Sequence, residues 1–320
     1  MAIGHAKMKI DTIKINLQIF TLSIFFILQS TSVFSAEIFY KPFILAQYVK
    51  STDTRKIAQL VRKRMINNGF QVVGSYSPFP GTEIIVISND KLRHYSSLSE
   101  NGIYATIQRI SITAINDQIQ ISYTNPTYMA HAYRLKNDLS DISSQLKKAL
   151  GFTVSFGAEQ GLTKEMLRNY RYKWIMMPQF TDRLELAEYP TQKEAIKAVL
   201  NALEKNEAGV RKIYRVDLEN KNETIIGVSM KGNGSNECSS DQYIMQKIDF
   251  KKLKSTGHLP YEIIIKNGSV NALFAEFRIA MNFPDLSMMG DNSFASIMCA
   301  PESILEALTL AAGGDPEDSW

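Results

Sequence analysis

The chain has 320 residues, of which 45% are hydrophobic and 21% charged, and its formal net charge is +4. These proportions are normal for a globular protein, and the length suffices for one large domain or two smaller ones. Without the basic N-terminal segment the charge is closer to balanced. Nucleic acid is therefore not expected as a partner, because neutralising phosphates requires clustered Lys and Arg.

The first 35 residues have the order of a secretion signal. Three lysines precede an apolar run over residues 17–28, and the small residues Val33 and Ser35 lie just before the predicted cleavage position. The run is shorter than the about 20 apolar residues that a membrane-spanning helix needs. We expect residues 1–35 to be a cleaved signal peptide and the mature chain to be periplasmic or secreted, with no membrane span after cleavage.

Taken in chain order, the mature sequence repeats one unit. The tetrapeptide Leu-Ala-Gln-Tyr at residues 45–48 recurs as Leu-Ala-Glu-Tyr at 186–189. Such self-similarity predicts an internal duplication. The predicted division is a first repeat over 36–150, a connector over 151–183 and a second repeat over 184–320.

In the first repeat a helix is predicted after Ser51 or Thr52 and before Gly69, with apolar residues on one helical face. Four strands and a second helix follow, and the last two strands form a hairpin that turns at Asn116-Asp117. The expected elements are strands over 71–76, 83–88, 104–115 and 118–123, then a helix over 142–150.

The second repeat has the same order. Thr191 and Glu194 form a capping box at the start of a helix that stops at Gly209. The Asn267-Gly268 pair is a strong hairpin signal. The expected elements are strands over 212–216, 224–229, 261–265 and 269–279, then a helix over 303–312.

These elements predict an α+β fold. Each repeat reads as strand, helix, two strands, hairpin and helix, which favours mainly antiparallel sheets with helices on one face. In the connector, residues 163–170 read as a short helix, and residues 232–240 in the second repeat read as an exposed loop.

The arrangement resembles a bacterial family known as domain of unknown function 302. The resemblance rests on the helix–strand–strand core of each half and on Leu259-Pro260-Tyr261-Glu262 leading into a strand. It implies a fold and an exported location, but no activity. Other short motifs are similar to those of secreted, duplicated hypothetical proteins: Asn-Pro-x-Tyr at 125–128, Met-Pro-x-Phe-x-Asp at 177–182, Phe-Arg-Ile-Ala at 277–280 and Phe-Pro-Asp-Leu at 283–286.

One candidate site is polar. His258, Glu262, Arg278 and Asp285 flank one hairpin and its exit, and strand alternation would place Glu276 on the same face as Arg278. Converging charges could bind an anionic or polar small ligand, with Arg offering a planar fork. The alternative is a structural ion-pair network, which has the same composition.

A second candidate involves the aromatic residues near the connector, of which Tyr128 is one, and the neighbouring His131. Tyr and Trp are enriched at binding surfaces, but they also pack between domains. His131 could form an acid–base pair with Asp138 or Asp141, although a lone histidine is usually structural. The aromatic set is Tyr123, Tyr128, Tyr133, Tyr170, Tyr172 and Trp174.

A third candidate is rich in sulfur. Met288, Met289, Met298 and Cys299 are soft ligands that favour Cu(I), whereas methionine also fills irregular gaps in a core. Cys299 could instead form a disulfide with Cys238, because both cysteines would meet an oxidising compartment.

The sequence carries no standard catalytic or cofactor-binding motif that we recognise, and it names no cofactor. We therefore expect a non-enzymatic binding module for an unknown small ligand or periplasmic protein partner. The alternatives are a Cu(I)-handling protein that uses residues 281–299 and an enzyme of unrecognised type.

Overall fold

The structure is a computed structural model that describes residues 37–171, 179–206, 208–232 and 234–318. The predicted signal peptide, Tyr172, Trp174 and the Met177-Pro178 motif lie outside the described residues. From Phe39 onward the chain clusters as one unit, in which we call the described residues up to 150 the first half and those from 184 onward the second half.

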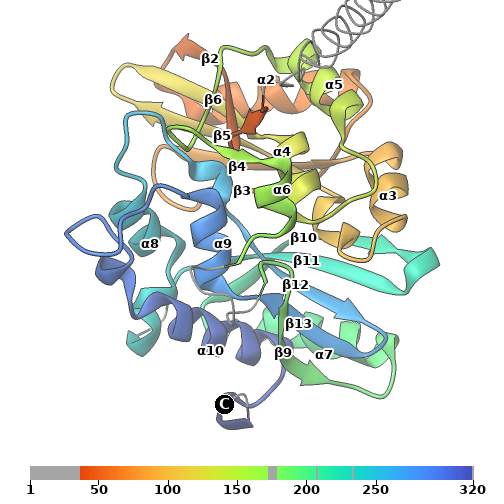
Figure 1. The fold of residues 1–320 in the computed structure, drawn as a ribbon. Coiled ribbons are helices and arrows are strands. Elements are labelled where there is room, and N and C mark those ends of the chain that lie inside the picture. The colour runs from red at the N-terminus through yellow and green to blue at the C-terminus, as the bar shows by residue number, and fades with distance from the viewer. Residues whose placement is uncertain (1–36, 172–178, 207, 233, 319–320) are drawn as a thin grey trace, which may run out of the picture. The chain divides into compact units, whose positions relative to one another are not determined.

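Two antiparallel sheets form the centre of this unit (Figure 1). The first sheet belongs to the first half, except for a short strand from the connector. Its strands, in spatial order, are β3 (Gln71–Tyr76), β4 (Thr82–Ser88), β5 (Gln108–Ile115), β6 (Gln118–Thr124), β2 (Phe43–Lys50) and β7 (Val154–Phe156).

The second sheet belongs to the second half and is also antiparallel throughout. Its strands, in spatial order, are β10 (Val210–Leu218), β11 (Glu223–Met230), β12 (Tyr261–Lys266), β13 (Ser269–Leu273) and β9 (Arg183–Glu188). Besides these two sheets, β1 (Phe39–Tyr40) pairs with β8 (Leu162–Thr163).

Each sheet has an outer face that helices cover. Strand alternation gives the first sheet an apolar outer face, on which Ile85 lies opposite Ile110, and α2 (Thr54–Asn67) and α5 (Ser140–Leu150) pack there. In the second sheet Ile226 lies opposite Ile263, under α7 (Gln192–Lys205) and α10 (Ala300–Ala312). Figure 1 shows α2 and α5 at the top of the view and α10 at the bottom.

Shorter helices connect these elements. The capping residues explain where several of them begin: Asn89 accepts a hydrogen bond from the Leu92 amide, and Ser240 accepts one from Tyr243. They are α3 (Asp90–Ser97), α4 (Pro126–Ala132), α6 (Lys164–Arg168), α8 (Asp241–Ile248) and α9 (Ala275–Asn282).

The predicted α+β class, with antiparallel sheets, is confirmed. The Thr191 hydroxyl accepts a hydrogen bond from the Glu194 amide at 3.2 Å, which is the N-cap half of the predicted capping box, and it donates to the Glu194 carboxylate at 3.0 Å. Both predicted hairpin turns are present, and Asn116 and Asn267 have positive φ angles of 56° and 54°. The start of α2 differs from the prediction, because Asp53 and not Ser51 or Thr52 caps it.

Three predicted segments were wrong in part. The strand expected over 104–115 begins at Gln108, after a 3-10 turn. The strand expected over 269–279 ends at Leu273, because α9 takes over at Ala275. The predicted loop over 232–240 contains a 3-10 helix, Gly234–Ser239.

The inner faces of the two sheets meet each other. On the first sheet this face is polar: Gln120 exchanges two hydrogen bonds with the backbone of Lys254, and Thr113 bonds to Thr256 at 3.0 Å. At the sheet edges β3 lies beside β10. A Cβ on Gly74 of β3 would come within 2.7 Å of the Ile213 carbonyl oxygen, so this contact requires glycine.

The two sheets share one strand order. Five strands of the first sheet have the spatial order β3, β4, β5, β6, β2, and the second sheet has the order β10, β11, β12, β13, β9. In both sheets the strand that comes first in the chain, β2 or β9, therefore lies beside the one that comes last, β6 or β13. The duplication itself remains a prediction, and this shared order is the structural observation that agrees with it.

Candidate functional site

Three charged side chains meet between the inner faces. Arg109 comes from β5, Glu262 from β12 and Arg278 from α9, and their side chains are only 4%, 2% and 2% exposed. Arg109 contacts one carboxylate oxygen of Glu262, and Arg278 lies 3.2 Å from the other. We call these three residues the buried triad.

The surroundings of the triad fix its geometry. The Tyr214 ring lies against Gly227, where a Cβ would come within 1.9 Å of the ring, and its hydroxyl lies 3.4 Å from Glu262 Oε1. Arg278 donates to the carbonyl oxygens of His258, at 2.7 Å, and Pro260, and its guanidinium stacks 4.3 Å from the Tyr261 ring centroid.

His258 lies in the same cluster and is fully buried. Burial lowers the pKa of its imidazole well below the ordinary value, and the nearby Arg278 and Arg109 lower it further. The ring is therefore neutral at physiological pH. Its Nε2 atom lies 3.2 Å from the Tyr261 hydroxyl.

A buried carboxyl lies on the other side of the same interface. Asp241, at the start of α8, accepts hydrogen bonds from the Tyr76 hydroxyl at 3.1 Å and from the Met230 amide at 3.2 Å. Burial raises its pKa to about 7, although both hydrogen bonds and Arg278 act in the opposite direction.

The prediction that His258, Glu262 and Arg278 converge is consistent with this geometry, but the expected strand relation was wrong. Glu276 and Arg278 lie in α9 and not on one strand face. Since the triad is at most 4% exposed, a solute reaches it only if the two halves separate. The arrangement therefore joins the halves and is not an open binding site.

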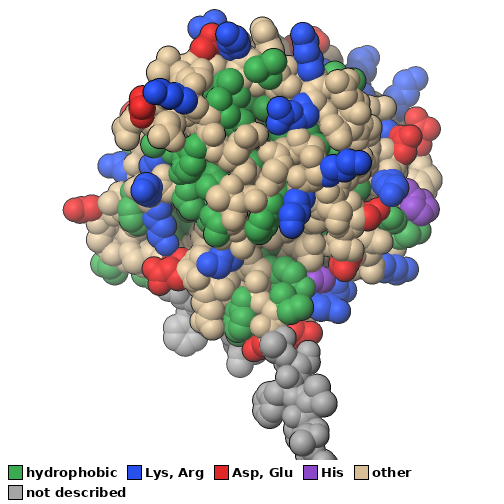
Figure 2. Space-filling model, turned by 90° about the horizontal axis from the view of Figure 1, so that it is seen from above, with side chains coloured by type: hydrophobic (Ala, Val, Ile, Leu, Met, Phe, Trp, Pro, Cys, Tyr) green, Lys and Arg blue, Asp and Glu red, His purple; other side chains and the backbone are tan. Residues whose placement is uncertain are grey.

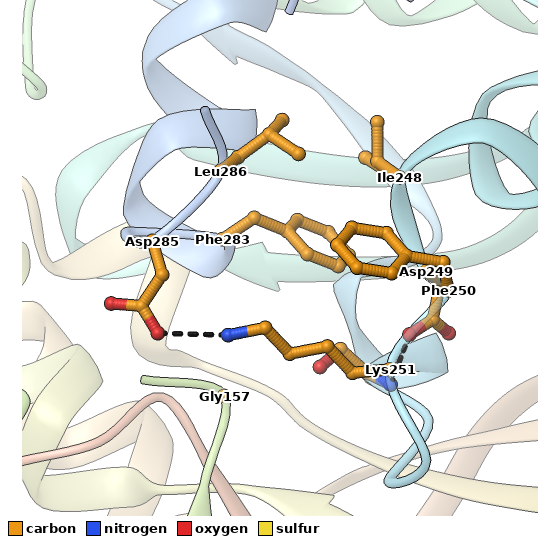
Figure 3. A pocket seen from close by; sticks show the side chains of 9 residues that line it. Gly157, Ile248, Asp249, Phe250, Lys251, Phe283, Asp285 and Leu286 are labelled. Atoms are coloured by element: carbon orange, nitrogen blue, oxygen red, sulfur yellow. Dashed lines mark hydrogen bonds and ion pairs between the residues drawn. The ribbon is translucent and has the colours of Figure 1, made fainter. Parts of the chain in front are cut away.

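Asp285 lies apart from the triad. Its Oδ2 accepts a hydrogen bond from the Glu159 amide at 2.8 Å and pairs with Lys251 at 3.0 Å. This ion pair borders a pocket of about 20 Å³, into which the rings of Phe283 and Phe250 project (Figure 3). That volume holds one water molecule and is too small for an organic ligand.

Tyr128 and His131 lie on α4 and are both buried. The Tyr128 hydroxyl donates to the Met281 carbonyl oxygen at 2.6 Å, so it links the two halves. The His131 ring packs edge-on against Tyr40, and burial lowers its pKa. Asp141, an expected acid–base partner, instead pairs with Lys91 at 3.1 Å.

In the sulfur-rich stretch the three methionines are exposed and the cysteine forms a disulfide. Met288, Met289 and Met298 are 39%, 77% and 82% exposed. Cys299 forms a disulfide with Cys238, with a Cα–Cα distance of 5.9 Å. A disulfide sulfur is not a thiolate, so Cys299 in this form is not the soft ligand that the copper hypothesis needs. Among the described residues, no group of three or more His, Cys, Asp or Glu is placed to hold a metal ion.

A polar cleft of about 400 Å³ was not predicted from the sequence. Residues of the first half, of the connector and of the second half all contribute to it, so it lies where the three parts meet. Its lining residues are Glu100, Asn101, Arg134, Thr181, Asp182, Arg183, Lys266, Ser269 and Asn271.

Two guanidiniums line this cleft. Arg183 at the start of β9 stacks 5.4 Å from the Tyr104 ring centroid. Arg134 has a left-handed backbone with φ of 58°, and its Nε donates to the Arg168 carbonyl oxygen at 2.6 Å. Lys266 differs from both, because it pairs with the buried Glu223 at 2.9 Å.

Comparisons with protein-family models, with curated proteins and with solved structures gave no match. The resemblance to domain of unknown function 302 therefore stays a prediction.

On the face seen in Figure 2, Lys and Arg side chains are spread among uncharged ones and form no continuous stripe. In the described part of the chain one segment, Ala295–Ala312, is long and apolar enough to cross a membrane. Most of it is α10, which packs against α7 and β9.

Proposed function

We propose that this chain is an exported, non-enzymatic binding module that holds a small polar ligand in the cleft between its halves. The observation that carries the proposal is the cleft itself, which both halves and the connector line with converging cationic, acidic and amide side chains. Binding pockets have this character, since a few placed polar groups orient the ligand, and clefts between structural units are frequent sites for them.

The buried triad supports this proposal indirectly. Glu262 lies on β12, four residues before Lys266, which lines the cleft. By joining Arg109 to this strand, the triad fixes the position of the second half against the first. The cleft walls are then pre-organised, which lowers the entropy that a ligand must lose on binding.

The other hypotheses have weaker support. Copper handling would depend on exposed methionines alone while Cys299 is in its disulfide. An enzyme would need a nucleophile beside a base. Of the two expected partners of His131, Asp141 pairs with Lys91, and Asp138 accepts a hydrogen bond from the Ser140 amide at 3.0 Å and acts on His131 only as a nearby charge. The cleft offers charges for binding without such a pair.

Native mass spectrometry of the protein purified from its export compartment tests the proposal. We expect a chain that begins at Ala36, together with a species of higher mass that carries the ligand. Ser269→Trp fills the cleft and should abolish the ligand-bound species. Ser229→Trp, the same change on β11 outside the cleft, should keep it. A ligand that persists in Ser269→Trp, or no ligand in any preparation, contradicts the proposal.

A further inference from the structure

We infer that the cleft binds a small zwitterion of the amino-acid type, with one carboxylate and one ammonium group. This inference rests on the proposed function, because it names the ligand class of the same cleft. It depends on the observation that cationic and acidic side chains line the cleft without forming ion pairs with each other.

The cationic side lies deeper. Arg183 and Arg134 are half-buried, and neither makes an ion pair with a carboxylate among the described residues. The Arg183 guanidinium carbon lies over the Tyr104 ring, 5.4 Å from its centroid. Arg134 uses its Nε and one terminal nitrogen on Arg168 and Gln179, which holds the group in place and leaves the second terminal nitrogen to bind a ligand. Planar guanidiniums held in this way bind carboxylates.

The acidic side lies at the rim. Glu100 and Asp182 are exposed, and within the described ranges neither carboxylate makes an ion pair. The Asp182 side chain accepts a hydrogen bond from the Gln179 amide at 2.8 Å, which fixes its orientation. Opposite charges thus face one cleft without pairing with each other.

This pattern selects among ligand classes. A polyanion would be attracted by the guanidiniums but repelled by Glu100 and Asp182. A simple cation would be attracted by these carboxylates but repelled by the guanidiniums. A zwitterion places its carboxylate on Arg183 and Arg134 and its ammonium toward the acidic rim. The cleft volume of about 400 Å³ leaves room for a side chain on the ligand.

Isothermal titration calorimetry of the full chain with each proteinogenic amino acid tests the inference. The tightest binder is then compared with its analogue that lacks the amine and its analogue that lacks the carboxylate. We expect each analogue to bind about tenfold more weakly or worse, since each loses one charge-assisted contact.

Variants separate the two ends of the ligand. Arg183→Gln should weaken the amino acid and its carboxylate-only analogue by about tenfold or more each. Glu100→Gln should weaken the amino acid but leave the carboxylate-only analogue as tight or tighter. Arg215→Gln, which removes an exposed arginine that pairs with Asp217, is the matched control and should change neither. Circular dichroism checks that each variant is folded.

Two results would overturn the inference. One is that no amino acid binds, and the other is that the carboxylate-only analogue binds as tightly as the amino acid in the wild type. If native mass spectrometry nevertheless finds a ligand that Ser269→Trp removes, the proposed function stands and only the ligand class is wrong. If that ligand also persists in Ser269→Trp, both fail.

Discussion

The buried triad makes a sharp prediction about stability. Glu262→Gln keeps the shape of the side chain and removes its charge, so Arg109 and Arg278 remain buried without the carboxylate that both contact. The folded state then holds two uncompensated guanidiniums. The unfolded state is unaffected, because there all three groups are in water.

The size of the effect follows from burial. Removing one partner of a buried ion pair costs about 3–5 kcal/mol. The separate loss of two charge-assisted hydrogen bonds, at about 1.5–3 kcal/mol each, gives a similar range. We therefore expect Glu262→Gln to lower the free energy of unfolding by about 3–5 kcal/mol. Arg109→Met in the same chain should recover part of this loss, since it removes one of the stranded charges.

Urea unfolding followed by circular dichroism measures the difference, read as a shift in the midpoint at constant slope. The control is Asp217→Asn, which breaks an exposed pair with Arg215 at 2.9 Å and should cost less than about 1 kcal/mol. If Glu262→Gln is no more destabilising than Asp217→Asn, the triad does not hold the halves together and the reasoning is refuted.

Three further predictions concern stability. Asp249 follows directly after α8 and accepts a hydrogen bond from the Ser255 amide at 2.9 Å. Burial raises the pKa of its carboxyl to about 7, so the folded state keeps a proton that the unfolded state loses above about pH 4. Stability should fall between these pH values by up to about 1.4 kcal/mol per pH unit for this group, and Asp241, whose pKa burial also raises to about 7, should contribute a similar fall. Asp249→Asn should therefore reduce the slope of the urea-midpoint profile without removing it; an unchanged slope would contradict the assignment. Reducing the bond between Cys238 and Cys299, 61 residues apart, should cost about 4 kcal/mol, seen as a lower midpoint in reductant; an unchanged midpoint would argue against the bridge. Tyr128→Phe should cost about 1–2 kcal/mol by losing its bond to Met281, with ligand affinity unchanged; an equal loss of affinity would tie this bond to the cleft.

The sequence predicted elements whose signals are local. A capping box or an Asn-Gly turn lies within a few residues, so Thr191 and Asn267 marked their elements correctly. The segment after Leu273 failed because α9 is buried on nearly all sides. A helix without a polar face has no 3.6-residue pattern, and its alternating residues read as a strand.

The site was predicted only in part. His258, Glu262 and Arg278 lie within 21 positions of one another, and their mixture of charges was recognisable in the sequence. Arg109, the third member of the buried triad, lies 153 positions before Glu262 and was not predicted, and the sequence could not show that the triad is closed to solvent. The cleft combines Arg134 and Arg183 with residues of β13, which follow 86 or more positions later. No spacing rule links positions that only the tertiary fold brings together.

The contacts between the two halves also determine when the first half can finish folding during synthesis. The inner face of the first sheet is covered by residues near Lys254, and within the described part of the chain Arg109 pairs with the carboxylate of Glu262 and no other. A chain that has emerged only as far as the connector therefore presents an open polar sheet face and a guanidinium with no counter-charge. The first half gains its native environment only after most of the second has been made, so folding is completed late. Truncation anywhere before Arg278 should leave a chain that proteases degrade and not a stable half.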